Sequence, residues 1–181
     1  MPTLTSQHRS DLVQLTELAE QDLAVVWRQL GNGSPRALLL DVIPDLITLY
    51  GEAAATLGAE WYDEMRDAAG VPGSFQGIAA ELPDVGRAEA LAGWATATGT
   101  ETATILTLAQ GGLQSTLANL DRMSVALSVG DDPKGKGWKR IGRGDCDFCR
   151  MLIGRGAVYT DATAHFATHD HCFCMAVPEF Q

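Results

Sequence analysis

Two short stretches near the end of the chain, Cys146-Asp-Phe-Cys149 and His169-Asp-His-Cys-Phe-Cys174, contain all four of its cysteines. A Cys-x-x-Cys turn places two thiolates about 2.3 Å from a common point, which is the length of a zinc–sulfur bond. A second group of thiol and imidazole ligands completes the tetrahedron that Zn²⁺ prefers. The spacing therefore predicts a small module of β-strands and loops that a structural zinc ion stabilises in place of a large core.

Five side chains in these stretches are the candidate zinc ligands: Cys146, Cys149, His169, Cys172 and Cys174. His169 and Cys172 have the spacing of one turn, and Cys172 and Cys174 share one face of a regular strand. His171 ranks below them. The alternatives are two disulfides, a redox pair or four unrelated thiols. The polar start of the chain, MPTLTSQHRS, does not read as a signal peptide, and in a reducing cytosol paired cysteines near histidines favour a metal.

The charges of the chain are spread unevenly along its 181 residues, and their sum is −10. Residues 1–130 carry 6 Lys and Arg against 16 Asp and Glu, whereas residues 131–181 carry 7 of each kind. An acidic region of this size argues against broad nucleic-acid binding, which needs clustered Lys and Arg for phosphate contacts. No run of 18 apolar residues lacks charge, so the sequence predicts no membrane span.

The single basic cluster contains Lys134, Lys136, Lys139, Arg140 and Arg143. Short charge runs of this kind are most often solvated linkers. The alternative function that this cluster permits is a zinc-module adaptor that binds nucleic acid through residues 134–143.

Apolar residues recur at steps of three or four over most of residues 1–130, which predicts three to five helices. We expect helices at about 6–30 and 35–69, with Pro44 kinking or dividing the second. Helical patterns return at about 84–94 and 100–128, and Gly111–Gly112 is expected to divide the last run. The charge-poor last run predicts packing on several sides, within the chain or against a partner subunit in a homo-oligomer.

The predicted organisation is therefore a helical region at 1–130, a linker at 131–137 and a zinc-binding module at 138–181. The linker is rich in glycine and in charges of both signs. In the module, Trp138, Ile141, Val158, Tyr159 and the run from Cys172 to Val177 indicate short strands. The expected fold class is mainly α, and α+β overall.

The sequence lacks the usual motifs of zinc enzymes and nucleotide-binding enzymes. It contains no His-Glu-x-x-His, no P-loop and no Rossmann fingerprint. No glutamate lies beside the histidines to act as the acid/base of a zinc deaminase. Asp170–His171 permits a metal-dependent nuclease of the His-Asn-His class as a minor hypothesis, but no Asn or His follows to complete that site. We therefore predict that the chain is not an enzyme.

Two stretches carry a resemblance to a known family: Ala59 to Phe75, AEWYDEMRDAAGVPGSF, and Trp138 to Pro178. The second begins WKRIGRGDCDFCRML and ends HDHCFCMAVP. Together they resemble MuF-like minor head proteins, also called minor capsid proteins, of the tailed phages of actinobacteria.

The resemblance implies a low-copy virion protein inside the phage head, bound to the portal protein or the major capsid protein. It implies a role in head assembly, and in some phages in the fate of DNA at ejection. Such a protein is expected in the host cytoplasm during assembly and has no catalytic activity in this module. Cys146, Cys149, His169, Cys172 and Cys174 occupy the metal-type positions of the family's ending.

Overall fold

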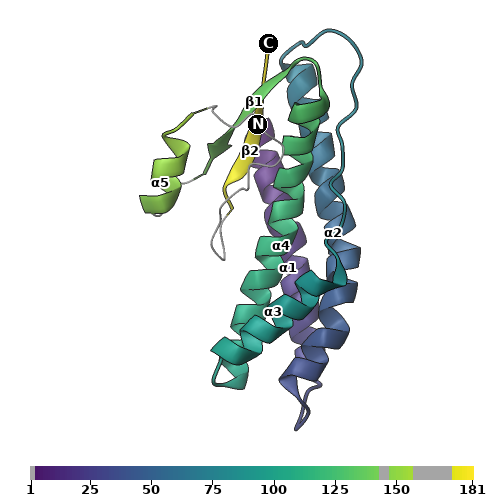
Figure 1. Ribbon diagram of the computed structural model, residues 1–181, viewed down its shortest axis with the longest axis vertical. Coiled ribbons are helices and arrows are strands. Elements are labelled where there is room, and N and C mark those ends of the chain that lie inside the picture. The colour runs from purple at the N-terminus through teal and green to yellow at the C-terminus, as the bar shows by residue number, and fades with distance from the viewer. Residues whose placement is uncertain (1–2, 143–146, 157–172) are drawn as a thin grey trace.

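The computed structural model describes residues 3–142, 147–156 and 173–181. In this part of the chain the elements follow the order α1 (Leu4–Trp27), α2 (Pro35–Ala68), α3 (Val85–Thr98), α4 (Thr102–Asp131), β1 (Gly135–Ile141), α5 (Asp147–Ile153) and β2 (Met175–Phe180). The fold is mainly helical with a small sheet, as predicted. Figure 1 shows the long helices α1, α2 and α4 side by side, with the two strands at one end of the bundle.

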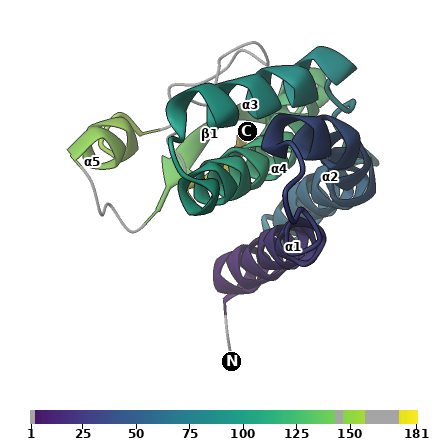
Figure 2. The ribbon, with the colours of Figure 1, turned by 90° about the horizontal axis from the view of Figure 1, so that it is seen from below.

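The third helix, α3, crosses the α2–α4 pair on the side opposite to α1 (Figure 2). The central pair is therefore covered on two sides, which explains why α4 is almost free of charged residues. None of the helices in the described ranges combines the length and apolar character that a membrane crossing requires.

Two expected helix breaks are absent. The second helix continues through Pro44, and α4 continues through Gly111 and Gly112. A Cβ atom at Gly112 would lie 2.1 Å from Leu91 Cδ1, so this glycine lets α3 cross close to α4. Packing on both sides of the α2–α4 pair outweighs the weak local helix propensity at these positions.

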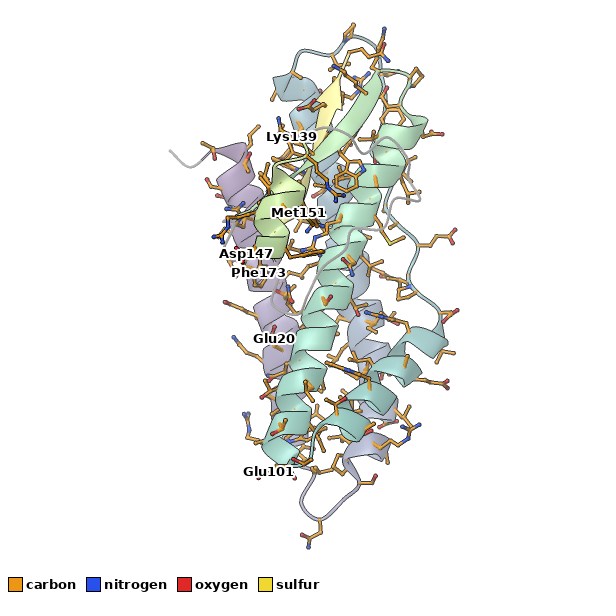
Figure 3. The ribbon with its side chains drawn as sticks, turned by 60° about the vertical axis from the view of Figure 1, so that its left-hand side comes forward. Glu20, Glu101, Lys139, Asp147, Met151 and Phe173 are labelled. Atoms are coloured by element: carbon orange, nitrogen blue, oxygen red, sulfur yellow. The ribbon has the colours of Figure 1, made fainter. Side chains whose placement is uncertain are left out.

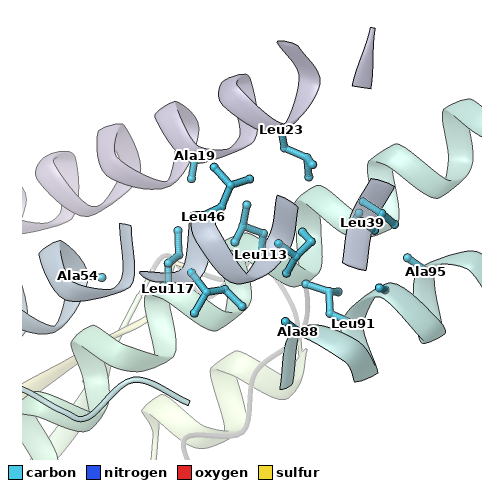
Figure 4. Packing of buried hydrophobic residues seen from close by; sticks show 14 of the residues in the cluster. Ala19, Leu23, Leu39, Leu46, Ala54, Ala88, Leu91, Ala95, Leu113 and Leu117 are labelled. Carbon is cyan, nitrogen blue, oxygen red and sulfur yellow. The ribbon is translucent and has the colours of Figure 1, made fainter. Parts of the chain in front are cut away.

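The main core fills the space between the four helices α1 to α4. Figure 4 shows Ala19 and Leu23 of α1 facing Leu46 of α2 and Leu113 and Leu117 of α4. Many of the remaining side chains in this cluster are alanines, so the helices approach closely. The backbones of α2 and α4 meet at Gly58, where a Cβ atom would lie 2.2 Å from the carbonyl oxygen of Asp121.

A second core joins the strands to the upper ends of α2 and α4. It contains Trp61, Tyr62, Val125, Ala126, Val129, Trp138, Met175, Ala176 and Val177. The strands are antiparallel, with Trp138 opposite Pro178 and Ile141 opposite Met175. Within the segment 131–137, α4 ends at Asp131 and β1 begins at Gly135. Because this core is shared by the strands and by α2 and α4, the sheet packs directly on the helices.

The connection between α2 and α3 is held to α4 by two serines one helical turn apart. Ser128 Oγ accepts a hydrogen bond from the amide of Ile78 at 2.8 Å, and Ser124 Oγ accepts one from Ala80 at 2.9 Å. Each serine also donates to the carbonyl four residues earlier. The amides of Ile78 and Ala80, which lie outside helices and strands, thus find hydrogen-bond partners on the buried face of α4.

Candidate metal centre

The last paired residues of the sheet mark the base of the predicted zinc module. Ile141 pairs with Met175, so Gly142 and Cys174 follow and precede this pair at the same end of the ladder. A Cβ atom at Gly142 would lie 2.5 Å from Cys174 Sγ, so the sulfur lies directly against the backbone of this glycine. The chain leaves the sheet here and returns here, and the segment between contains the other four predicted ligands.

Cys149 enters the site from α5. This short helix has one buried face, formed by Cys149 and Leu152, and its Phe148 and Met151 are exposed. It packs against β1, and Figure 3 shows Asp147 and Met151 on the helix and Lys139 on the strand. Arg150 contacts Asp147 on the exposed side of α5.

The structure brings Cys149 and Cys174 together in one small buried cluster, with Ile153 packed against it. Their exposed fractions are 4% and 5%. One cysteine comes from the first predicted pair and the other from the second. The fold thus brings one thiol of each predicted pair together at the end of the sheet, and thiolates are among the ligands that Zn²⁺ prefers.

Three of the predicted ligands, Cys146, His169 and Cys172, lie outside the described residues. Within the ranges that the structure does describe, no group of three or more His, Cys, Asp or Glu is placed to hold a metal ion. The described part therefore contains two of the five predicted ligands, whereas a tetrahedral zinc site needs four.

Arg122 of α4 fixes the backbone beside Cys174. Its Nε donates to the Cys174 carbonyl at 2.8 Å, its Nη1 donates to Asn119 Oδ1 at 2.9 Å, and the residue is 1% exposed. Sequence reasoning missed this role of Arg122. The available signal was a lone cation within a helix that is otherwise almost uncharged.

A second buried polar group surrounds Asp132, one residue after α4. Tyr62 Oη and Arg66 Nε each donate to its Oδ2 at 2.9 Å, and the Lys134 amide donates to its Oδ1 at 2.9 Å. Burial by itself raises the pKa of Asp132, but the bonds from Lys134, Arg66 and Tyr62 outweigh it and lower that pKa below its ordinary value. Burial and the bond to Asp132 raise the pKa of Tyr62.

A third polar group links α1 to the central pair. The His8 ring stacks on Trp61 with centroids 4.6 Å apart, and His8 Nε2 lies 2.9 Å from Asp121 Oδ1. These two atoms are within ion-pairing distance but do not meet the angular requirement of a hydrogen bond. His8 is 3% exposed and Asp121 is fully buried, so this pair has no open access for a substrate.

Comparison with known protein families gives one match, and it spans almost the whole chain. A family model described as VG15 protein matches residues 2–181. The chain belongs to the VG15 protein family. The name of this family points to a phage protein. No curated protein and no solved structure matches the VG15 chain.

The basic cluster of this VG15 chain is dispersed by the fold. Lys139 forms an ion pair with Glu179 at 2.8 Å, and Arg140 is 3% exposed. Lys134 and Lys136 are exposed, and Arg143 lies outside the described residues. Of the five cations, Lys139 is thus paired with a carboxylate and Arg140 is buried. Both facts weaken the support for a nucleic-acid interface along residues 134–143.

Proposed function

We propose that this VG15 chain is a structural protein of the phage virion, a low-copy minor head protein at the portal or the inner face of the capsid. Its role is in head assembly and in the fate of DNA at ejection. The observation that carries the proposal is the family match over residues 2–181, which points to a phage protein. The resemblance of residues 138–178 to MuF-like proteins supplies the finer assignment.

The shape of the molecule supports a role in assembly. Long helices of 24, 34 and 30 residues give the bundle extended faces. Large apolar side chains are exposed at several places on these faces and on α5: Leu4, Leu18, Val25, Leu49, Phe148 and Met151. Exposed apolar side chains of this kind are suited to contacts with other proteins.

The polar clusters of the described residues also favour a structural role. The side-chain contacts of Asp132 and Asp121 are buried, and they connect helices and loops to one another. Side chains that connect elements in this way support a structural role for these two clusters.

The proposed head protein is tested by quantitative mass spectrometry of purified phage particles. We expect the chain in mature virions at a copy number close to that of the portal protein and far below that of the major capsid protein. Co-expression with the portal protein should yield a complex that survives size exclusion. A chain that is abundant in infected cells and absent from purified particles would contradict the proposal.

The zinc module is the second part of the proposal. Cys149 and Cys174, with two ligands from Cys146, His169 and Cys172, would hold one structural Zn²⁺ and leave no open position for a reactive water. The supporting observation is that thiols from both predicted pairs are buried together at the end of the sheet.

Metal content measured on protein purified without a histidine tag tests the module. We expect about one zinc per chain and thiols that react only after chelation. Cys149→Ser should release the metal and expose residues 143–173 to protease, whereas Met151→Ala, on the exposed side of α5, should do neither. Metal-free protein with four freely reactive thiols would remove the zinc from the proposal.

A further inference from the structure

The outer face of α1 is a helical face that no described element covers. This helix packs on α2 and α4 through His8, Leu12, Thr16, Ala19, Leu23 and Trp27. Figure 2 shows α1 at the edge of the molecule, on the far side from α3. On the face that points away from the bundle, Leu4, Leu18 and Val25 are 45%, 52% and 44% exposed.

These three residues belong to a stripe with the spacing of a coiled-coil seam. Alternating steps of three and four residues give the series Leu4, Gln7, Asp11, Gln14, Leu18, Gln21, Val25 and Arg28. In heptad notation the a positions are Leu4, Asp11, Leu18 and Val25, so three of the four are leucine or valine. The d positions are Gln7, Gln14, Gln21 and Arg28, so three of the four are glutamine. A solvated helix face usually carries many charges, yet this stripe has one anion and one cation in a chain of net charge −10.

We propose that this stripe is the contact surface for a second copy of the chain, with the two α1 helices antiparallel. In this register Asp11 faces Arg28 of the partner subunit, and Leu18 faces Gln21 of the partner subunit. Gln14 then faces Val25 of the partner subunit. The two-fold axis repeats each contact, so the interface contains the ion pair between Asp11 and Arg28 twice.

The positions of the two charges select this orientation. All three of these contacts pair an a position with a d position, as antiparallel seams require. A parallel pair would place Asp11 against Asp11 and Arg28 against Arg28, which is repulsive. Two further exposed carboxylates, Glu17 and Asp22, flank the stripe. Asp22 accepts a hydrogen bond from Tyr50 Oη at 2.5 Å within its own chain. It is therefore held beside α2 and away from the seam.

The size of the seam predicts a weak dimer. The stretch from Asp11 to Arg28 is about 26 Å long at 1.5 Å per residue. Four of the six seam positions in this stretch are polar, and one helix pair lies at the low end of specific interface areas. We therefore expect dissociation in the micromolar range. The dimer leaves α3, the sheet and α5 uncovered, and it does not depend on the proposed function.

Sedimentation velocity of the full chain over a concentration series, from roughly 1 to 200 µM, tests the dimer. The wild type should shift from monomer to dimer. Leu18→Glu should remain monomeric at every concentration. Val85→Glu is the matched control, because Val85 is 64% exposed at the start of α3, and this variant should dimerise as the wild type does.

A charge exchange tests the antiparallel register. Arg28→Asp places two carboxylates against each other at both ends of the seam and should weaken association about tenfold or more. The double variant Asp11→Arg/Arg28→Asp restores opposite charges and should regain most of the wild-type affinity. Far-UV circular dichroism confirms that each variant is folded. A wild type that stays monomeric, a dimer that survives Leu18→Glu, or a dimer indifferent to Arg28→Asp would each overturn the proposal.

Discussion

Asp132 is the residue on which the end of the bundle depends most directly. Its carboxylate accepts hydrogen bonds from the hydroxyl of Tyr62, the guanidinium of Arg66 and the amide of Lys134. Arg66 donates in turn to the carbonyls of Val71 and Gly73. One buried anion therefore holds together the end of α4, the end of α2 and the loop that follows.

The lowered pKa of Asp132 gives a prediction with a definite sign. Because its pKa is lower in the folded protein than the ordinary 3.8, its contribution to stability is present above that value. The contribution is lost as pH falls below the ordinary value and through the lower pKa of the folded protein. Asp132→Asn should reduce the free energy of unfolding at pH 7 by about 3 kcal/mol, because Arg66 is left buried without its counter-ion.

Urea unfolding at pH 7 and at pH 3 measures this effect, and the gap between wild type and Asp132→Asn should shrink at the lower pH. Asp131→Asn is the control, since Asp131 is the exposed neighbour at the end of α4. It should change stability by no more than about 0.5 kcal/mol. A gap of equal size at both pH values would contradict the role given to Asp132.

At the scale of elements, small residues decide how closely the helices approach one another. The backbones of α2 and α4 meet at Gly58, where a Cβ atom would lie 2.2 Å from the Asp121 carbonyl oxygen. The His8 contact to Asp121 lies beside this crossing. The separation of α2 and α4 therefore also sets the position of α1.

Gly58→Ala should push α2 and α4 apart and destabilise the protein by about 2 kcal/mol or more. The comparison is Gly93→Ala in α3, where the nearest atom to the new methyl is Arg36 Nη1 at 3.3 Å, the end of a flexible side chain. That substitution should be neutral or stabilising by up to about 1 kcal/mol, because it removes backbone freedom from the unfolded chain. Urea midpoints of the two variants measure the difference, and equal values would argue against backbone contact at Gly58.

At the scale of the whole molecule, the sheet and the helical bundle share buried surface. The Trp61 Nε1 donates to the Ala176 carbonyl at 3.1 Å, and Arg122 donates to the Cys174 carbonyl at 2.8 Å. Trp138 is 2% exposed among residues of α2 and α4. These contacts attach β2 to both central helices, whereas the cluster of Cys149 and Cys174 is separate from that core.

We therefore expect β1 and β2 to unfold together with α4, and α5 to open at a lower free energy. Native-state hydrogen exchange measures both, through the protection of amides in Lys139–Ile141, in the middle of α4 and in α5. Amides of the sheet should exchange with the same free energy as those of α4. A sheet that opens well before α4 would instead support two separate domains joined at 131–137.

The sequence by itself determined the features that depend on neighbouring residues. Apolar residues at helical spacing predicted the long helices, including the ends of the first two, to within a few residues. Apolar and aromatic residues predicted strands at Trp138 and Ile141 and in the run from Cys172 to Val177, and β1 and β2 overlap these two stretches. The spacing of the cysteines predicted both halves of the candidate metal centre, of which Cys149 and Cys174 lie in the described residues.

Only the tertiary structure decided the features whose partners are distant in the chain. Pro44 and Gly112 remain inside continuous helices because packing from α1, α3 and the central pair outweighs local propensity. The partners of Asp132 lie 66 and 70 positions away in Arg66 and Tyr62, and no local pattern marks such pairs. Arg122 was likewise placed beside Cys174 by the docking of the sheet on α4. A buried charge is stabilised by whichever group folding brings to it, and that group is set by the packing of whole elements.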